Sequence, residues 1–336
     1  MPEALVNTVP VPFPTPAPNQ ASTDKEIKAQ VHRYYQATTE DYLRYYQTDW
    51  HHHMHYGFDR DLPPGGNPTE HMVRYLARLA GISKGERMLD AGCGVGGSSI
   101  FLSRELGCRS VGITLVESQA RLARGFASSA RSFANIAHGS SSNAQGTIIE
   151  PGGSVSEPDG SIIEPDARFV VNDFHAPAFK PASFDIVWAV ESFDHAVDKE
   201  AWVRTMYSLL KPGGRLIIAD GFRARAPASA TQADSYASFL SGWAVPHLCS
   251  ADELESYGAA AGFELRHRED ISADVMPHAR AIFRFGLIFI PLRWLLQKLR
   301  LTSPEKLGNA YATYYQYRTL KQGLWNYGVF CFHKRP

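Results

Sequence analysis

The chain has 336 residues, 44% hydrophobic and 20% charged, which is the composition of a globular protein built as one large domain or as a domain with an appendage. Its formal net charge is zero, so bulk charge gives no argument for binding nucleic acid, and no nucleic-acid partner is expected. The 4 cysteines have no paired spacing, which argues against a disulfide framework or structural zinc and predicts a cytoplasmic location.

The N-terminal part of the chain divides into a tail and a lid. Residues 1–24 are rich in proline and lack the basic start and apolar core of a signal peptide, which predicts a disordered tail. From Glu26 to Tyr46 apolar and aromatic residues recur at helical spacing, and a histidine-rich stretch follows from Trp50 to Gly57. We therefore expect residues 25–66 to form a helical and aromatic lid.

A glycine-rich turn follows the next predicted helix, which runs from the capping residue Asn67 to about Gly81. An apolar strand from Arg87 leads into the turn Asp90-Ala-Gly-Cys-Gly-Val-Gly-Gly97, and another helix opens directly after it. Glycines in such a turn let backbone N–H groups approach a ligand closely, and the helix start adds partial positive charge. The pattern predicts a site for a nucleotide-like ligand.

Two kinds of cofactor compete for this turn, because Gly92, Gly94 and Gly97 also satisfy the spacing of a dinucleotide site. Asp90 would repel a pyrophosphate, whereas it would attract an ammonium, a sulfonium and ribose hydroxyls, and S-adenosylmethionine carries all three. A dinucleotide site also places an acid roughly 20 residues further on, where this chain has Thr114. We therefore favour S-adenosylmethionine over nicotinamide or flavin cofactors.

Further along the chain, strands alternate with helices, and the alternation predicts an α/β fold with a parallel sheet covered by helices on both faces. Helices are expected from about Glu117 and over 199–210. Strands are expected at 110–113, 168–171, 184–190 and 215–219, with a closing strand at 327–333. A loop insertion at about 137–166 interrupts the rhythm with three copies of a seven-residue unit; proline and glycine in each copy exclude a helix.

Polar groups gather where two of these strands end, and ligands of open parallel sheets bind at that edge. After the strand at 168–171, Asp173 can accept a hydrogen bond from the exocyclic amine of an adenine while Phe174 packs on the ring, although a helix cap would also explain Asp173. After the next strand, the run from Glu191 to His195 carries several ionisable groups, which favours a functional site.

Two other segments leave alternatives open. His51 and His55 would share a helix face as zinc ligands can, but no acidic or cysteine ligands accompany them, so a zinc site is the less favoured interpretation. Residues 281–296 are strongly apolar but too interrupted to span a membrane. They would cap a lipophilic pocket, rest on a membrane surface or form a buried core helix.

Five motifs carry a family resemblance; they lie at 89–97, 111–119, 172–179, 187–195 and 210–214. In this order and spacing they resemble those of the S-adenosylmethionine-dependent methyltransferases. The most similar branch holds tocopherol, sterol and prenyl-diphosphate C-methyltransferases and cyclopropane-fatty-acid synthases. The resemblance implies a Rossmann-like, mostly parallel seven-stranded sheet in a methyltransferase domain over 67–336, with a helical cap at about 222–320 inserted before the last strand.

The same resemblance implies roles for individual residues, which fall into three groups. The residues expected to bind the cofactor are Asp90, Gly92, Gly94, Thr114, Gln119, Asp173 and Phe174. The residues expected to contact the substrate are Tyr35, Trp50, His55 and Tyr56. The residues expected to be catalytic are Glu191, as the base that deprotonates a carbocation, and His195. No metal is expected, except Mg²⁺ if the substrate is a diphosphate.

The expected function is methyl transfer to a carbon of a small lipophilic molecule, either terpenoid, sterol-like or a prenylated aromatic. Methylation of an alkene creates a carbocation that must be shielded from water and deprotonated, and a carboxylate in an aromatic pocket serves both needs. Two alternatives stay open. One is N- or O-methylation of a hydrophobic alkaloid or phenol, and the other is a methyltransferase fold repurposed for cyclisation. The sequence does not predict the oligomeric state.

Overall fold

The computed structural model describes residues 24–43, 52–139 and 166–336. The tail expected at 1–24 and the insertion expected at 137–166 lie almost entirely outside these residues, and Trp50 lies outside them as well.

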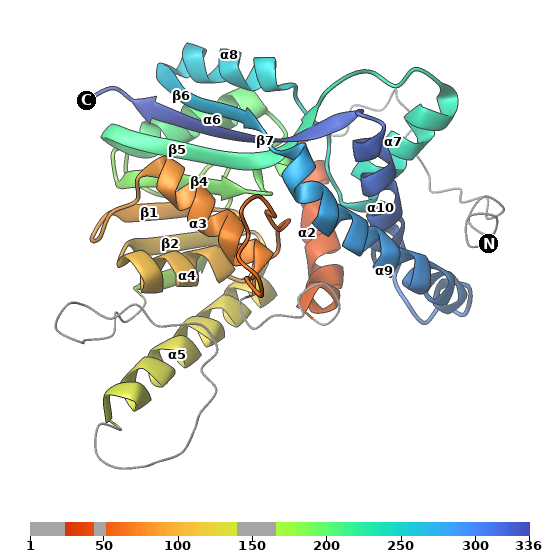
Figure 1. Ribbon diagram of the computed structural model, residues 1–336, viewed down its shortest axis with the longest axis horizontal. Coiled ribbons are helices and arrows are strands. Elements are labelled where there is room, and N and C mark those ends of the chain that lie inside the picture. The colour runs from red at the N-terminus through yellow and green to blue at the C-terminus, as the bar shows by residue number, and fades with distance from the viewer. Residues whose placement is uncertain (1–23, 44–51, 140–165) are drawn as a thin grey trace.

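A seven-stranded sheet forms the centre of the protein, with the order β3-β2-β1-β4-β5-β7-β6 (Figure 1). The strands are β1 (Arg87–Ala91), β2 (Arg109–Thr114), β3 (Ala167–Val171), β4 (Phe184–Val190), β5 (Leu210–Arg223), β6 (Phe263–Asp270) and β7 (Trp325–Lys334). The first five run parallel, and β7 is antiparallel to both of its neighbours. The mostly parallel, Rossmann-like sheet predicted from the sequence is therefore confirmed.

Helices cover both faces of the sheet, because alternate residues of each strand point to opposite sides. On one face Trp188 of β4 packs in the same buried cluster as Leu76 of α3. On the other face its neighbour Val187 packs with Trp202 of α6. The helices are α2 (Asp24–Asp41), α3 (Pro68–Ala80), α4 (Gly97–Leu106), α5 (Glu117–Gly139), α6 (Lys199–Leu209), α7 (Ala230–Gly242), α8 (Ala251–Ala261), α9 (Ser272–Lys298) and α10 (Pro304–Lys321).

The start and end of α3 follow from its sequence. The side chain of Asn67 accepts hydrogen bonds from the backbone N–H groups of Thr69 and Glu70, at 2.9 and 3.2 Å. Pro68 occupies the first turn, where its missing N–H costs nothing, and Gly81 ends the helix in a left-handed conformation with φ 58°. The predicted helix from Asn67 to about Gly81 is therefore confirmed.

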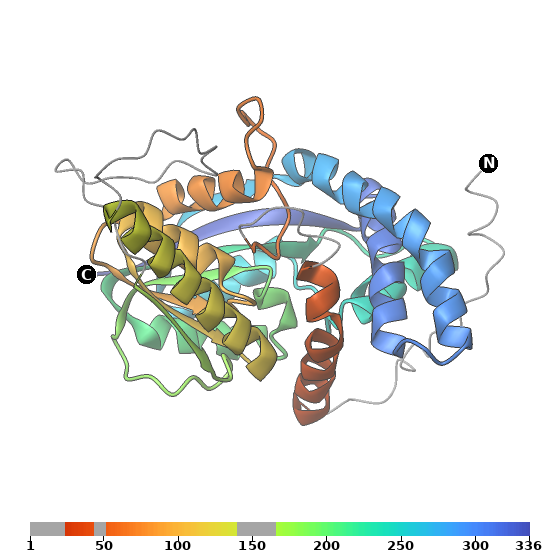
Figure 2. The same cartoon turned by 90° about the horizontal axis from the view of Figure 1, so that it is seen from below.

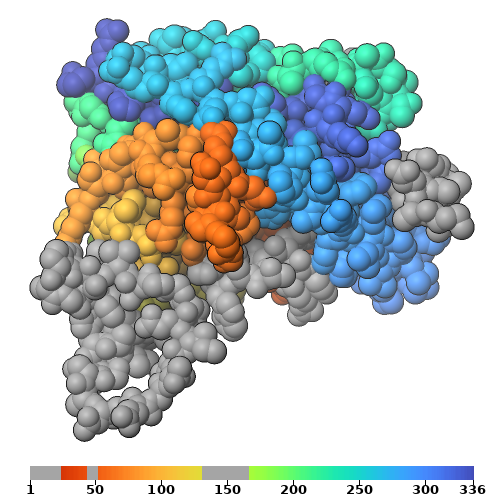
Figure 3. Space-filling view, viewed as in Figure 1, coloured from red at the N-terminus to blue at the C-terminus, as the bar shows by residue number. Residues whose placement is uncertain are grey.

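A helical cap stands beside the carboxyl ends of the strands and consists of α7, α9 and α10, with α2 packed against it (Figures 1 and 2). Two interactions join α2 to the cap. Tyr34 donates a hydrogen bond to Asn309 at 2.9 Å, and Asp41 forms an ion pair with Arg293 at 2.7 Å. In Figure 3 residues 52–66 lie beside α9, where Arg60 pairs with Asp274 at 2.5 Å.

Residues 222–320 do not form a helical cap throughout. Within them, α8 leads into β6, which pairs with β7 and completes the edge of the sheet. The sequence of β6, Phe-Glu-Leu-Arg-His-Arg-Glu-Asp, is mostly charged, as is typical of an exposed edge strand. The hydrophobic alternation that revealed the other strands is therefore absent here.

No helix among the described residues is both long enough and apolar enough to pass through a membrane.

Candidate active site

The carboxyl ends of the parallel strands meet at one edge of the sheet, and chemically active side chains lie there. Asp90 belongs to the end of β1 and Thr114 to the end of β2, while Glu191 follows β4 directly and Asp220 lies in the last part of β5. All four side chains line cavities at this edge.

In the glycine turn after β1, other side chains lie close to the backbone at two positions. Gly92 has φ 109° and Gly94 has φ 52°, in the left-handed region that favours glycine. A Cβ atom on Gly92 would collide with the side chain of Ser192, and one on Gly94 would lie 3.1 Å from the sulfur of Met54. Both glycines line a cavity of about 80 Å³, which we call the cofactor cavity.

Asp90 lies in the wall of this cavity and is only 4% exposed. The hydroxyl of Ser99 donates a hydrogen bond to its carboxylate at 2.7 Å. Burial raises the pKa of Asp90 from 3.8 to about 7, with the Ser99 hydrogen bond opposing the shift. A buried carboxylate with one hydrogen-bond donor suits a ligand that brings positive charge or hydroxyl donors.

Thr114 and Gln119 lie together in the same cavity. The Thr114 hydroxyl donates to the side-chain oxygen of Gln119 at 2.7 Å, and the Gln119 amide donates to Thr39 of α2 at 3.2 Å. The two residues are almost completely buried and are held in fixed orientations, as a hydroxyl-binding pair would require.

Of the two residues expected at an adenine, Phe174 lines the cofactor cavity and Asp173 does not. The Asp173 carboxylate accepts hydrogen bonds from the ring and backbone N–H of His175 and forms an ion pair with Lys28 at 2.7 Å. Burial acts to raise its pKa, but these hydrogen bonds prevail and hold the pKa well below its usual range. Asn172, next to Asp173 in sequence, does line the cavity.

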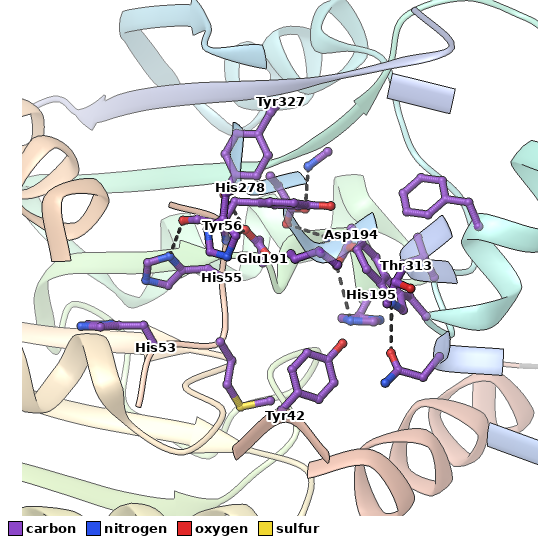
Figure 4. Close-up of a pocket in the computed structure, with 18 of the residues that line it drawn as sticks. Tyr42, His53, His55, Tyr56, Glu191, Asp194, His195, His278, Thr313 and Tyr327 are labelled. Carbon is purple, nitrogen blue, oxygen red and sulfur yellow. Dashed lines mark hydrogen bonds and ion pairs between the residues drawn. The ribbon is translucent and has the colours of Figure 1, made fainter. Parts of the chain in front are cut away.

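A second cavity of about 320 Å³, the acceptor cavity, lies beside the first and is lined mostly by aromatic and apolar side chains (Figure 4). It is bounded by the sheet edge, by α2 and by the cap helices α7, α9 and α10. The residues that line both cavities are Tyr35, His53, Met54, His55, Glu191 and His195. A ligand in each cavity would therefore meet the other at Glu191 and His195.

Glu191 is held in a strained and buried position. Its backbone has φ 48°, which is uncommon for a residue other than glycine and is frequent at functional sites. Its Oε1 accepts hydrogen bonds from the backbone N–H of Tyr56 at 2.6 Å and from the hydroxyl of Tyr327 at 2.9 Å. Burial raises the pKa of Glu191 well above its ordinary value in spite of these donors.

His195 is oriented through both ring nitrogens. Nδ1 lies 3.3 Å from the carbonyl oxygen of Ala244, which can only accept, so Nδ1 carries the hydrogen. Nε2 then accepts from the hydroxyl of Tyr35 at 2.8 Å. Burial lowers the pKa of His195 to about 4, which leaves the ring neutral at neutral pH, with Nε2 as a hydrogen-bond acceptor.

The structure brings together most of the residues expected at the substrate. Tyr35, His55 and Tyr56 line the acceptor cavity, and Tyr56 also donates from its hydroxyl to Gln316 of α10 at 2.6 Å. Figure 4 shows His55, Tyr56 and Glu191 close to one another in the cavity wall. Trp50 lies outside the described residues.

Several residues of the acceptor cavity were not expected from the sequence. One is the carboxylate Asp220, whose Oδ2 accepts from the backbone N–H groups of Ser192 and Asp194, both at 3.1 Å. The carboxylate of Asp194 also lines the cavity, and it belongs to the ionisable run from Glu191 to His195 that the sequence pointed to. Asp220 was detectable, since it lies near the carboxyl end of a recognised strand. Others include Tyr34, Tyr42, His278, Asn309, Thr313 and Tyr327, which come from segments far apart in the sequence.

Within the described part of the chain, no group of three or more histidine, cysteine, aspartate or glutamate side chains is placed to hold a metal ion. The zinc alternative depended on His51, which lies outside the described residues.

Comparisons with known proteins place the chain in a family. A family model described as a methyltransferase domain matches residues 59–268. The 2-methyl-6-phytyl-1,4-hydroquinone methyltransferase of Synechocystis sp. is 27% identical over 242 residues, which are 68% of this chain and 64% of that protein. The chloroplastic tocopherol O-methyltransferase of Arabidopsis thaliana is 29% identical over 182 residues, which are 50% of this chain and 43% of that protein.

The chain thus spans less than two thirds of the length of these two relatives. Among solved structures, the [4+2]-cyclase SpnF has a TM-score of 0.65 and 20% identity over 92% of this chain and 97% of that chain. Identity at this level shows the fold alone. Because the methyltransferase-domain model matches more than half of the residues, the chain belongs to the methyltransferase domain family, as its motifs predicted.

Proposed function

We propose that the chain is an enzyme that methylates a small lipophilic molecule with S-adenosylmethionine as methyl donor. The observation that carries this proposal is the meeting of two cavities at Glu191 and His195. One cavity has the glycine turn and the buried Asp90 that suit the cofactor. The other has the aromatic walls that suit a lipophilic acceptor.

The residues of the cofactor cavity fit S-adenosylmethionine chemically. Asp90 provides a buried carboxylate for its ammonium and hydroxyl groups, and the glycine turn leaves backbone N–H groups accessible. Thr114 and Gln119 provide hydroxyl and amide partners for a ribose. When bound, this cofactor supplies a methyl group activated by a positively charged sulfur. A cation beside Asp90 also lowers the pKa of its carboxyl and so favours the ionised form.

For the acceptor atom we favour carbon, with Glu191 as the base. When an alkene carbon gains a methyl group, the positive charge appears on its former double-bond partner and is lost when a C–H bond beside that cation gives its proton to a base. When an aromatic carbon gains a methyl group, the charge is spread over the ring and is lost when the C–H bond of the methylated carbon gives its proton to a base. Glu191 lies at the junction of the two cavities, and its raised pKa makes its ionised form a stronger proton acceptor than an exposed glutamate. Two hydrogen bonds to one oxygen hold the carboxylate in place.

O- or N-methylation is the alternative, and the geometry of His195 favours it. Its neutral ring presents the Nε2 lone pair toward Tyr35 at the same junction. A phenol or hydroxyl acceptor that replaced the Tyr35 hydroxyl at this nitrogen could lose its proton to His195 as the methyl group arrives. The methyl group would then stay on oxygen.

The charges of the acceptor cavity argue for a substrate that is neutral where it is buried. Three carboxyl groups, Glu191, Asp194 and Asp220, line the cavity, and no lysine or arginine does so among the described residues. A diphosphate would find no cation here to neutralise it, and any of these carboxyl groups that is ionised would repel it. Hydroquinones, sterol-like alcohols and isoprenoid alkenes therefore fit better than prenyl diphosphates, and no role for Mg²⁺ is proposed.

The test is an incubation of the purified protein with S-adenosylmethionine and a panel of a prenylated hydroquinone, a sterol and an isoprenoid alcohol. Formation of S-adenosylhomocysteine together with a product heavier by one methylene group supports the proposal. Mass spectrometry of that product, before and after cleavage of methyl ethers, separates carbon from oxygen as acceptor. If the cofactor binds but is never consumed while an acceptor is rearranged, the protein is a cyclase and the proposal is wrong.

A further inference from the structure

The far half of α9 and the turn after it carry an unusual concentration of exposed apolar side chains. Among the described residues, the exposed large hydrophobic side chains outside this region are only Val170 and Val171 of β3. Those in this region are Ile288 (72% exposed), Leu292 (49%), Trp294 (39%), Leu295 (49%), Leu299 (57%) and Leu301 (70%), which we call the α9 patch. A contiguous apolar patch on a protein surface marks a contact with another apolar phase or partner.

The spacing of the α9 patch shows that it is one face of a helix whose other face is already packed. Ile288, Leu292, Leu295 and Leu299 follow one another at intervals of four, three and four residues, which aligns them along α9. Ile290 points the other way and packs in a buried cluster with residues of α10. The packing of the cap therefore leaves the outer face of α9 exposed.

Positive charge flanks the α9 patch along its own segment of the chain. The residues from 275 to 304 include no aspartate or glutamate. Four basic residues of this segment are exposed: Arg280, Arg284, Lys298 and Arg300. Arg284 lies one turn before Ile288 on the same face, and the Lys298 ammonium lies 5.6 Å from the centre of the Trp294 ring. Apolar side chains, a tryptophan and flanking cations are the composition of helices that lie in the headgroup region of membranes.

We propose that the α9 patch docks on a membrane surface that contains anionic lipids. The charge decides between this occupant and a second copy of the chain. A two-fold contact through the patch would set Arg284 and Lys298 of one copy against the same cations of the other, and those cations would repel one another. An anionic bilayer offers both the apolar layer and the opposite charge, worth about fivefold in affinity for each cation near the surface.

The position of α9 joins this surface to the acceptor cavity. His278 and Ile282, in the first half of α9, line the cavity, while the patch lies in the second half of the helix and in the turn after it. Figure 1 shows the course of α9, and Figure 4 shows His278 in the cavity. A lipophilic acceptor dissolved in the bilayer would thus have a short route to the cavity along α9. This delivery role rests on the proposed function, whereas docking on the membrane does not.

Vesicle binding of the full chain tests the proposal without substrate or cofactor. The protein is sedimented with vesicles of phosphatidylcholine alone and with vesicles of equal parts phosphatidylcholine and phosphatidylglycerol, at low and high salt. We expect binding to the mixed vesicles that weakens with salt. Leu292→Glu with Leu295→Glu should abolish it, and Arg284→Gln with Lys298→Gln should weaken it by roughly 25-fold if both cations contribute fully.

Matched controls change similar residues elsewhere: Val170→Glu alters an exposed apolar side chain of β3, and Arg109→Gln removes an exposed cation of β2. Both should bind as the unchanged protein does. No binding to mixed vesicles, or equal loss in the Val170→Glu control, would overturn the proposal. So would a dimer in sedimentation analysis that the Leu292 and Leu295 changes convert to a monomer, because the patch would then bind a second copy. Failure of methyl transfer with vesicle binding intact would refute only the proposed function.

Discussion

Replacing Asp90 by asparagine should stabilise the protein and at the same time remove cofactor binding. The carboxyl group is 4% exposed, and burial raises its pKa from 3.8 to about 7. A group whose folded-state pKa is raised binds more protons in the folded chain than in the unfolded chain between the two pKa values. The free energy of unfolding therefore decreases as the pH rises from about 4 to about 7, and it recovers nothing above that.

The size of the effect follows from the shift of about 3 pKa units. At 1.36 kcal/mol per unit, the raised pKa of Asp90 lowers the free energy of unfolding by about 4 kcal/mol at pH 8, where the folded chain holds the charge. At pH 5 it lowers it by about 2 kcal/mol, because the folded chain must take up a proton that the unfolded chain has lost. Asparagine is never charged, and its side-chain oxygen still accepts from Ser99. The Asp90→Asn variant should therefore melt roughly 6 °C higher than the unchanged protein at pH 8, with the difference vanishing near pH 4.

Thermal unfolding of both proteins across this pH range measures the stability, and calorimetric titration with S-adenosylmethionine measures the binding. The variant should lose that binding because it lacks the charge that attracts the ligand. Ser99→Ala serves as the control, since it keeps the charge, removes its hydrogen bond and should lower the melting temperature at pH 8. A variant that is less stable at pH 8, or that differs equally at every pH, would refute the argument that burial disfavours the Asp90 charge.

Three further outcomes are expected. Glu191→Gln keeps an oxygen for both hydrogen bonds to Oε1, so it should bind S-adenosylmethionine unchanged and lose roughly 10²- to 10⁴-fold in kcat; full release of S-adenosylhomocysteine would exclude Glu191 as the base. If His195 is the base, kcat should fall only as the pH drops through about 4, and a fall near 6.5 in the pH profile would contradict its burial. Gly92→Ala should abolish cofactor binding. Backbone strain alone costs roughly 1 to 3 kcal/mol, and the free energy of unfolding should fall by more than this, because the new Cβ atom also collides with Ser192. Gly65→Ala is the control: its φ is 75° and the space around it is free, so denaturant unfolding should show the cost of strain alone.

The sequence predicted the parts of the site that depend on local pattern. Asp90 and Glu191 were detectable because each lies at the carboxyl end of a strand with clear hydrophobic character, and the sheet brings such ends together. The edge strand β6 was not predicted from the sequence, because its charged residues show no hydrophobic alternation. The lid over 25–66 and the cytoplasmic location remain predictions.

Other parts of the site depend on contacts that no local pattern encodes. Tyr327 lies in β7, more than a hundred residues after Glu191, and it reaches the carboxylate only because β7 inserts between β5 and β6. His278 reaches the acceptor cavity from α9. We expected Asp173 to face the adenine, but its carboxylate instead accepts hydrogen bonds from Lys28 and His175. The contact with Lys28 could not be predicted, because Lys28 lies 145 residues away in the sequence.

Helix α2 forms ion pairs near both of its ends and lines both cavities. Lys28 pairs with Asp173 on the sheet side, Asp41 pairs with Arg293 on the cap, and between them Tyr35 lines both cavities. Any displacement of this helix therefore opens the two cavities together. Ligand binding in one cavity is then thermodynamically linked to ligand binding in the other. If a ligand in the cofactor cavity stabilises the closed position of α2 and so increases the affinity of the acceptor cavity, a ligand in the acceptor cavity must increase the affinity of the cofactor cavity by the same factor.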